Sequence, residues 1–200
     1  MTFIDQLIQI DGNLLIGIQH SLNADWLTSV MKGVSFFGNI GWASILLCIV
    51  LMCFKKTRRL GFLCAGSVLL TFICCTGIIK PLVDRPRPWE VFSAVQPLIP
   101  DPGDSSFPSG HASNSMAVAF AFWLNTRKSN TVSLVEDRCR LHRWSYVVIV
   151  FALLIALSRL YLGMHFPTDV IGGMLVAIIC SQIIYLINIK IETKHGIISK

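Results

Sequence analysis

Five long apolar segments dominate this sequence and restrict what it can fold into. A helix needs roughly 20 predominantly apolar residues to cross the hydrocarbon core of a membrane, which is about 30 Å thick. The segments that approach this length are Phe36–Phe54, Leu60–Ile79, His111–Leu124, Ser145–Gly163 and Asp169–Asn188. The third is the shortest, and the polar run Ser113–Ser115 near its start indicates a helix that faces protein or water. The sequence therefore predicts an all-α fold, a polytopic membrane helical bundle.

The composition supports this class and excludes others. Hydrophobic residues make up 54% of the 200-residue chain and charged residues only 14%, whereas soluble domains carry about 25% charge. The net charge of +6 does not indicate nucleic-acid binding, because the basic residues form short clusters between apolar segments. The seven cysteines lie mostly inside those segments, as packing residues do. The length suits one domain, so we expect residues 1–200 to form a single integral-membrane domain.

The first 35 residues carry an amphipathic pattern. Apolar residues recur at helical spacing from Phe3 to Leu22, but Asp5, Asp11 and Gln19 interrupt them. No basic segment precedes this stretch, which argues against a secretory signal peptide. The pattern favours an interfacial helix on the membrane surface, with a sixth membrane span as the alternative. We therefore expect five to six spans together with an N-terminal interfacial helix.

The distribution of positive charge predicts an orientation. Twelve of the seventeen Lys and Arg residues fall between spans one and two, between spans three and four, or after span five. These residues are Lys55, Lys56, Arg58, Arg59, Arg127, Lys128, Arg138, Arg140, Arg143, Lys190, Lys194 and Lys200. Alternate loops share one side of a membrane, and an excess of Lys and Arg marks the cytoplasmic side. We expect a multi-pass protein of a bacterial inner or plasma membrane, with that end inside the cell.

Basic residues also crowd the opposite, outer face. They are Lys80, Arg85, Arg87 and Arg159. A single Lys or Arg there commonly extends to the interface without a further role, as Lys32 does in this interpretation. The four, however, fall within two of three short stretches, 80–88, 108–111 and 158–169, which alternating topology brings to the same membrane depth. The sequence therefore predicts a shared pocket at the outer face.

Such a pocket would suit a phosphate group. Lys80, Arg87 and Arg159 supply positive charge, and each guanidinium can make paired hydrogen bonds to phosphate oxygens. Ser109 is a natural N-cap of the third span, and Gly110 lets the backbone approach closely. The free N–H groups at a helix N-terminus bind anions, although a Ser-Gly pair alone is more often a plain helix cap.

Two histidines and an aspartate add reactive groups to this pocket. Pro167 suits the first turn of the fifth span, so His165 lies just before that helix and Asp169 within its first turn. A carboxylate there can accept a hydrogen bond from His165, which fixes the tautomer and makes the imidazole more nucleophilic. His111 offers a second imidazole as a proton donor. Together with three fixed cations, these residues indicate phosphoryl transfer through a covalent phosphohistidine.

The same residues resemble the pattern of the type 2 phosphatidic acid phosphatase superfamily, which shares its phosphate site with vanadium haloperoxidases. The three motifs are Lys80 with Arg87-Pro88 after six intervening residues, Pro108-Ser109-Gly110-His111, and Ser158-Arg159 followed by His165 and Asp169. All three match in order and without a departure. The resemblance extends from Lys80 to Asp169, and the flanking spans agree with the helical bundle of that family.

The resemblance implies a role for each matching residue. It makes His165 the nucleophile, Asp169 its orienting partner and His111 the acid that protonates the leaving oxygen. The implied phosphate cradle consists of Lys80, Arg87, Ser109, Gly110 and Arg159. Family members work without a metal, and we expect neither a metal nor another cofactor here, because the fixed cations supply the positive charge. Arg85 lies outside the pattern, and no role follows for it.

The predicted function is that of a membrane-embedded lipid phosphatase, a metal-independent hydrolase that removes the terminal phosphate of a lipid phosphate or pyrophosphate. Its partners are then the membrane and a lipid substrate that enters from the bilayer, and not nucleic acid. Undecaprenyl pyrophosphate is the first expectation, with phosphatidylglycerol phosphate and phosphatidic acid as alternatives. A vanadate-dependent haloperoxidase is more remote, since those enzymes are typically soluble. An anion or lipid transporter would usually carry ionisable groups near the bilayer midplane.

Overall fold

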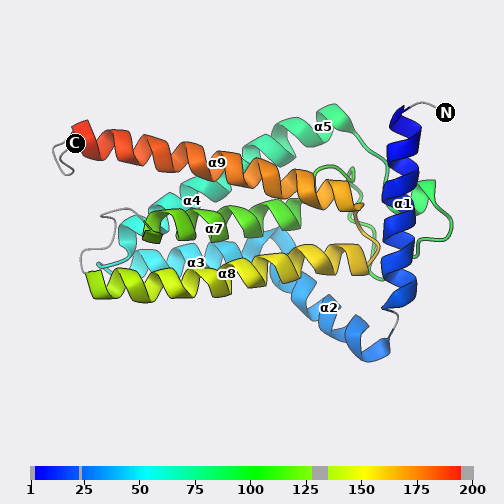
Figure 1. Ribbon diagram of the computed structural model, residues 1–200, viewed down its shortest axis with the longest axis horizontal. Coiled ribbons are helices and arrows are strands. Elements are labelled where there is room, and N and C mark those ends of the chain that lie inside the picture. Colours follow the sequence, from blue (N-terminus) through cyan, green and yellow to red (C-terminus); the bar gives the residue numbers. More distant parts are fainter. Residues whose placement is uncertain (1–2, 23, 128–134, 195–200) are drawn as a thin grey trace.

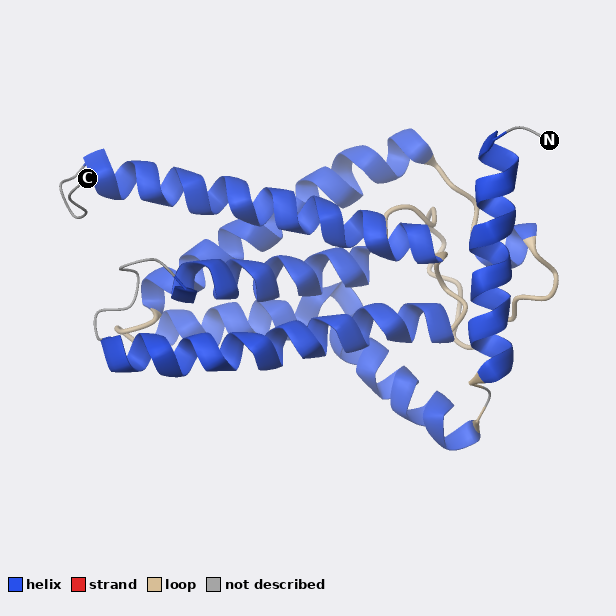
Figure 2. Ribbon diagram, in the orientation of Figure 1, coloured by secondary structure: helices blue, strands red, loops and turns tan. Residues whose placement is uncertain are grey.

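The computed structural model describes residues 3–22, 24–127 and 135–194, and all regular elements within these ranges are helices (Figure 2). The α-helices are α1 (Phe3–Ser21), α2 (Asp25–Gly38), α3 (Trp42–Cys53), α4 (Arg58–Phe72), α5 (Lys80–Val83), α6 (Pro88–Val91), α7 (Gly110–Arg127), α8 (Val135–Tyr161) and α9 (Pro167–Lys194). A 3₁₀ turn, Asn39–Gly41, joins α2 to α3, and a π-helical stretch, Ile73–Ile79, joins α4 to α5. The predicted all-α class is confirmed.

Helices α3, α4, α7, α8 and α9 lie alongside one another, and α7 lies among the other four (Figure 1). Alanine and serine side chains of α7, such as Ala117, Ala119 and Ser113, are fully buried. Small residues let neighbouring helices approach closely in a membrane bundle. The polar start of this segment therefore faces protein, as its sequence indicated.

Three described stretches are long and apolar enough to cross a membrane, namely Arg58–Val91, Cys139–Tyr161 and Pro167–Lys194. Helices α2 and α3 together qualify as a fourth span, bent by 52° at the turn between them. The sequence predicted a span over Phe36–Phe54, but Gly41 within it adopts a left-handed conformation with φ of 71°, which interrupts the helix. Helix α7 does not qualify, because its polar residues lower the hydropathy of the segment. Several of these residues, such as Ser113 and Asn125, are buried among the other helices.

Helix α1 lies across one end of the bundle (Figure 1). It is not among the described helices that qualify as a span, so its placement agrees with an interfacial helix and not with a sixth span. Its inner face is buried at Asp11 and Leu15, whereas Ile10 and Leu14 are exposed. Exposed apolar side chains such as Ile10 and Leu14 are what a helix at a membrane surface presents to lipid.

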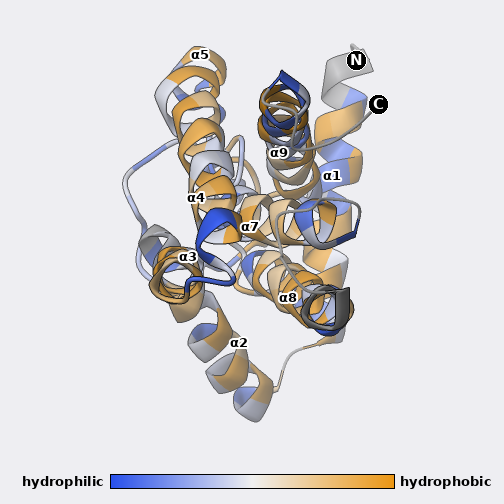
Figure 3. Ribbon diagram, turned by 90° about the vertical axis from the view of Figure 1, so that its left-hand side faces the viewer, coloured by the Kyte–Doolittle hydropathy of each residue, from blue (hydrophilic) through white to orange (hydrophobic). Residues whose placement is uncertain are grey.

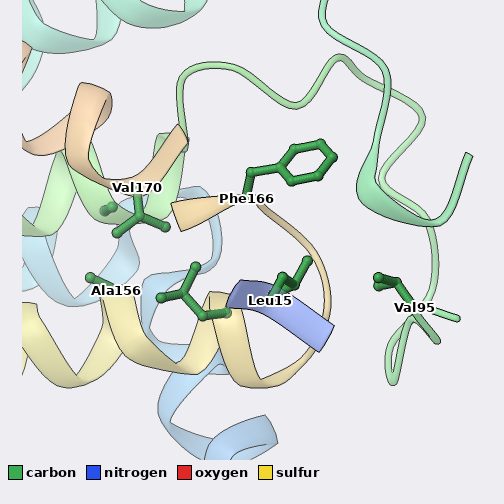
Figure 4. Packing of buried hydrophobic residues seen from close by; sticks show 7 residues of the cluster. Leu15, Val95, Ala156, Phe166 and Val170 are labelled. Carbon is green, nitrogen blue, oxygen red and sulfur yellow. The ribbon is translucent and has the colours of Figure 1, made fainter. Parts of the chain in front are cut away.

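A compact apolar cluster fastens α1 to the bundle. Leu15 of α1 is fully buried against Phe166, Val170, Ala156 and Val95 (Figure 4). Ala156 comes from α8, Phe166 from the loop between α8 and α9, Val170 from the start of α9 and Val95 from the segment after α6. The cluster places α1 directly beside the loop that joins α8 to α9.

The basic loops lie at the end of the bundle opposite α1. Figure 3 views the molecule from that end and shows hydrophilic residues at the connection between α3 and α4. The end of α7, the start of α8 and the end of α9 lie at this same end (Figure 1), so the predicted grouping of the basic segments at one end is confirmed for the described residues. Lys128 and Lys200, which contributed to the predicted orientation, lie outside the described residues.

Candidate active site

The three predicted stretches meet at the end of the bundle beside α1. Arg87, in the loop before α6, donates a hydrogen bond to the carbonyl of Met164 (2.6 Å). The backbone N–H of Ser109, just before α7, donates to the carbonyl of Asp169 in α9 (3.0 Å). Residues up to about 80 positions apart in the chain therefore share one site. All eight predicted site residues belong to these three stretches.

His165 lies in the loop between α8 and α9 and is almost completely buried. Its Nδ1 atom donates a hydrogen bond to the carbonyl oxygen of Ser106 (2.8 Å). Its Nε2 atom therefore keeps a lone pair, which faces Nη1 of Arg87 at 3.1 Å. Burial lowers the pKa of His165 to about 4, and the positive charge of Arg87 acts in the same direction, while Asp169 opposes them. The imidazole is neutral at pH 7, as a nucleophile must be.

Asp169 lies beside this histidine, but not in the simple pairing that the sequence suggested. Its Oδ2 atom is 3.6 Å from Nδ1 of His165, which is longer than a hydrogen bond. The same oxygen accepts the backbone N–H of Phe166 (2.8 Å) and a short hydrogen bond from the Ser106 hydroxyl. The carboxylate therefore orients the histidine in part through Ser106, whose carbonyl holds the ring. Ser106 belongs to no motif, so no pattern in the sequence pointed to it.

Lys80 and Arg87 share a carboxylate that the sequence did not single out. Both side chains make short ion pairs with Asp104, and Nε of Arg87 also donates to the Asp104 carbonyl (2.9 Å). Burial raises the pKa of Asp104, but Lys80 and Arg87 outweigh it and hold this pKa below the usual value. An anionic group thus binds between these two cations, which is the behaviour expected of a phosphate cradle.

Arg159 contributes the third cation from the last turn of α8. The side chain is buried, and its Nη1 atom donates to the hydroxyl of Ser35 in α2 (2.5 Å). Its Nε atom has no hydrogen-bond partner among the described residues. Buried donors are nearly always paired. The unpaired Nε–H of Arg159 therefore suits a bound ligand whose oxygen atoms accept hydrogen bonds.

The start of α7 completes the cradle. Around Gly110 no described heavy atom lies within 4 Å of the position that a Cβ would take, so its backbone is accessible. The Nε2 atom of His111 donates to Oδ1 of Asn39 (2.8 Å). At Gly38 a Cβ would stand 2.7 Å from the His111 ring, so a glycine there lets α2 pack against the imidazole. Neither Asn39 nor Gly38 was predicted, because the sequence placed both within a plain apolar span.

A cavity of about 310 Å³ adjoins the His111 side of the site. Polar groups on its lining include Lys32, Asn39, His111 and Arg159, and apolar ones include Phe36, Ile99 and Met164. Phe36 is largely exposed on the surface of the bundle. The cavity therefore connects the cations of the site with the apolar surface that faces lipid.

The site contains fixed cations and imidazoles rather than an arrangement of metal ligands. No group of three or more His, Cys, Asp or Glu side chains that could hold a metal ion is found in residues 3–22, 24–127 and 135–194. The chemistry that this chain itself can supply is phosphate binding, nucleophilic attack by a neutral imidazole, and proton transfer by a second imidazole.

The fold and the site together define a polytopic membrane protein with a phosphate-binding, histidine-containing centre. The chain matches the PAP2 superfamily over residues 61–192 and belongs to this family. It is therefore a lipid phosphatase of the PAP2 family, a multi-pass membrane enzyme. The resemblance seen in the three motifs is thereby confirmed.

Several characterised proteins are similar to this chain. An undecaprenyl-diphosphatase of Bacillus subtilis is 31% identical over 76% of this chain and 70% of its own length. A lipid A 4'-phosphatase of Bacteroides thetaiotaomicron is 28% identical over 96% of this chain and 82% of its own length. The crystal structure of a PAP2-type phosphatidylglycerolphosphate phosphatase from Bacillus subtilis matches with a TM-score of 0.72 at 25% identity, over 95% of this chain and 89% of that one. These relatives act on different lipids.

Proposed function

We propose that this chain is an undecaprenyl-diphosphate phosphatase that releases the terminal phosphate through a phosphohistidine. The cavity beside His111 carries the proposal, because it adds the positive charge of Lys32 to that of Arg159. A lipid diphosphate keeps one phosphate on its leaving group, and that phosphate needs a cation on this side of the site. The similarity to a Bacillus undecaprenyl-diphosphatase supports the same substrate.

In the proposed chemistry each predicted residue acts at a particular step of the reaction. Nε2 of His165 attacks the terminal phosphorus, and a P–N bond forms while the bond to the oxygen of the lipid phosphate breaks. Lys80, Arg87 and Arg159, with the backbone N–H groups at Ser109 and Gly110, balance the charge on the transferred group. His111 donates a proton to the leaving oxygen. It then takes a proton from the water that hydrolyses the phosphohistidine and releases inorganic phosphate.

We further propose that the site faces the outside of the cell. The excess of Lys and Arg in the loops at the opposite end supports this orientation. Cysteine substituted at Asp101 should react with an impermeant thiol reagent added outside, whereas Cys139 should not. These tests need a background without other accessible thiols. The reverse pattern would place the site in the cytoplasm.

Lys32 gives a direct test of the substrate. We expect Lys32→Gln to lower kcat/KM several-fold for undecaprenyl pyrophosphate and to leave phosphatidic acid hydrolysis unchanged, because a monophosphate has no second phosphate near this side chain. Lys55→Gln, at the opposite end of the bundle, is the matched control. Initial rates of phosphate release by the purified chain in detergent, with phosphatidylglycerol phosphate as a third substrate, would decide. A preference for a monophosphate lipid would contradict the proposal.

The cations of the phosphate cradle also predict that the enzyme works without a metal ion. The fixed cations take the charge-stabilising part that Mg²⁺ has in many phosphoryl transfers. Activity is therefore expected to survive excess EDTA, and orthovanadate should inhibit by occupying the cradle. A strict requirement for Mg²⁺ would contradict this mechanism.

A further inference from the structure

Arg85, which belongs to none of the three motifs, connects two carboxylates at the edge of the site. Its Nη1 atom donates to Oδ1 of Asp169 (2.6 Å) and its Nη2 atom donates to Oδ2 of Asp11 (2.7 Å). Its guanidinium carbon stands 4.0 Å from the centre of the Phe166 ring. A planar guanidinium with this many partners has one preferred position, so Arg85 fixes the distance between the two carboxylates.

Asp11 is an unusual residue for a helix at a membrane surface, because its side chain is only 3% exposed. Besides Arg85, it accepts the backbone N–H of Thr168 (3.0 Å) and a short hydrogen bond from the Thr168 hydroxyl. Thr168 lies in the first turn of α9, where free N–H groups and the helix dipole favour an anion. Asp11 therefore binds α1 to the first turn of the helix that carries Asp169.

Arg85 and His165 lie on opposite sides of the Asp169 carboxylate. Arg85 binds Oδ1, whereas Oδ2 faces His165 and accepts hydrogen bonds from Ser106 and Phe166. Both oxygens of the carboxylate are thus held, and its plane cannot rotate without breaking a charged hydrogen bond. Loss of Arg85 would leave Asp11 and Asp169 as two buried carboxylates without the cation between them.

We propose that Arg85 and Asp11 are positioning residues for His165, and that α1 is thereby a working part of the active site as well as a membrane-surface helix. The proposal rests on the phosphohistidine mechanism above. Arg85 acts through Asp169 and Ser106 on the ring of His165, and Asp11 holds Arg85 in place. The order of contacts predicts that Arg85 matters more than Asp11.

A positioning role and a merely structural one differ in what they change. The rate constant of phosphoenzyme formation in a single turnover reports the orientation of His165, whereas the amplitude reports the fraction of competent sites. We expect Arg85→Gln to lower the rate constant on the order of 10–100-fold, because a displacement of about 1 Å in a reacting group can cost up to about 10²-fold, with a near-normal amplitude. Arg85→Lys, which keeps the charge but loses the planar fork, should be intermediate. Asp11→Asn should slow the step less than Arg85→Gln.

The chain supplies a matched control at its other end. Arg59 pairs with the buried carboxylate of Glu192 at 2.8 Å, so Arg59→Gln breaks a similar pair far from His165. The experiment is rapid quench of the full chain in detergent with ³²P-labelled undecaprenyl pyrophosphate, and Arg59→Gln should keep the wild-type rate constant. An unchanged rate constant with reduced amplitude in Arg85→Gln, or equal slowing in Arg59→Gln, would overturn the positioning role alone. Absence of a phosphoenzyme in the wild-type chain would overturn the proposed nucleophile and this inference with it.

Discussion

The two ends of the bundle each carry a buried carboxylate of α9 paired with an arginine, yet only one end is a reactive site. Asp169 and Glu192 are both fully buried, and they pair with Arg85 and Arg59. At the Glu192 end, Oε2 has no hydrogen-bond partner among the described residues, and the nearby polar contact comes from Asn188. At the Asp169 end, both oxygens are bound and a buried histidine stands beside them.

This difference shows what makes a buried ion pair functional. A pair alone compensates for the cost of burying charge and stabilises little beyond that. The pair of Asp169 and Arg85 at the α1 end also lies beside the imidazole of His165. The further cations near it, Lys80, Arg87 and Arg159, can bind an anion. Substitutions at the two ends are therefore expected to have different consequences, mainly on chemistry at one end and mainly on stability at the other.

The largest expected effect follows from removing the nucleophile. His165→Ala should lower turnover on the order of 10⁴-fold or more and leave no acid-labile phosphoenzyme. His142→Ala, which removes a histidine at the opposite end, should retain both. Label that persists in His165→Ala after rapid quench with a ³²P-labelled lipid would assign the nucleophile to another residue.

Removal of the proton donor should have a smaller effect that depends on the substrate. General acid catalysis contributes about 10²–10⁴-fold, so His111→Ala should lose that much on a lipid alkoxide leaving group. The loss should shrink toward unity with p-nitrophenyl phosphate, whose leaving group needs no proton. Measured kcat/KM across leaving groups of decreasing pKa would test this. A constant loss across the series would show that His111 binds or positions instead.

The buried histidine also predicts a dependence of stability on pH. Burial lowers the pKa of His165 from 6.5 to about 4, so between these values the unfolded chain binds a proton that the folded chain does not. Stability is therefore lost as the pH falls from 6.5 toward about 4, by on the order of 3 kcal/mol. Apparent melting temperatures in detergent should fall less steeply over this range for His165→Asn than for the wild-type chain. Parallel curves would contradict the burial of a neutral imidazole.

The smallest effect on chemistry is expected at the opposite end. Glu192→Gln removes the charge that Arg59 pairs with, but Arg59 is partly exposed and can be solvated. We expect a loss of about 1–2 kcal/mol in the free energy of unfolding, below the range for a fully buried pair, with kcat unchanged. Thermal unfolding and phosphate release measured on the same preparation would separate the two. A large loss of kcat with unchanged stability would mean that the two ends are coupled.

Much of the fold was accessible from the sequence, and the structure refined particular elements. The apolar segments predicted the helices of the bundle, and the amphipathic pattern before Leu22 predicted that α1 lies on the surface. The bend between α2 and α3 was missed, because Asn39 and Gly41 sit within an otherwise continuous apolar segment. The π-helical stretch before Lys80 was missed for the same reason, since a one-residue change of helical register leaves no mark on hydropathy.

What the sequence by itself determined is therefore the class of the fold, the family, and the residues that carry charge and imidazole to one end of the bundle. Hydropathy and motif spacing are local properties, and they suffice for those conclusions. Only the tertiary structure decided which atoms meet: that the Ser106 carbonyl holds His165, that Asp104 pairs with both Lys80 and Arg87, and that α1 reaches the site through Asp11. These contacts join residues 17 to 74 positions apart. Side-chain direction across such separations depends on how the helices pack, and no local pattern encodes it.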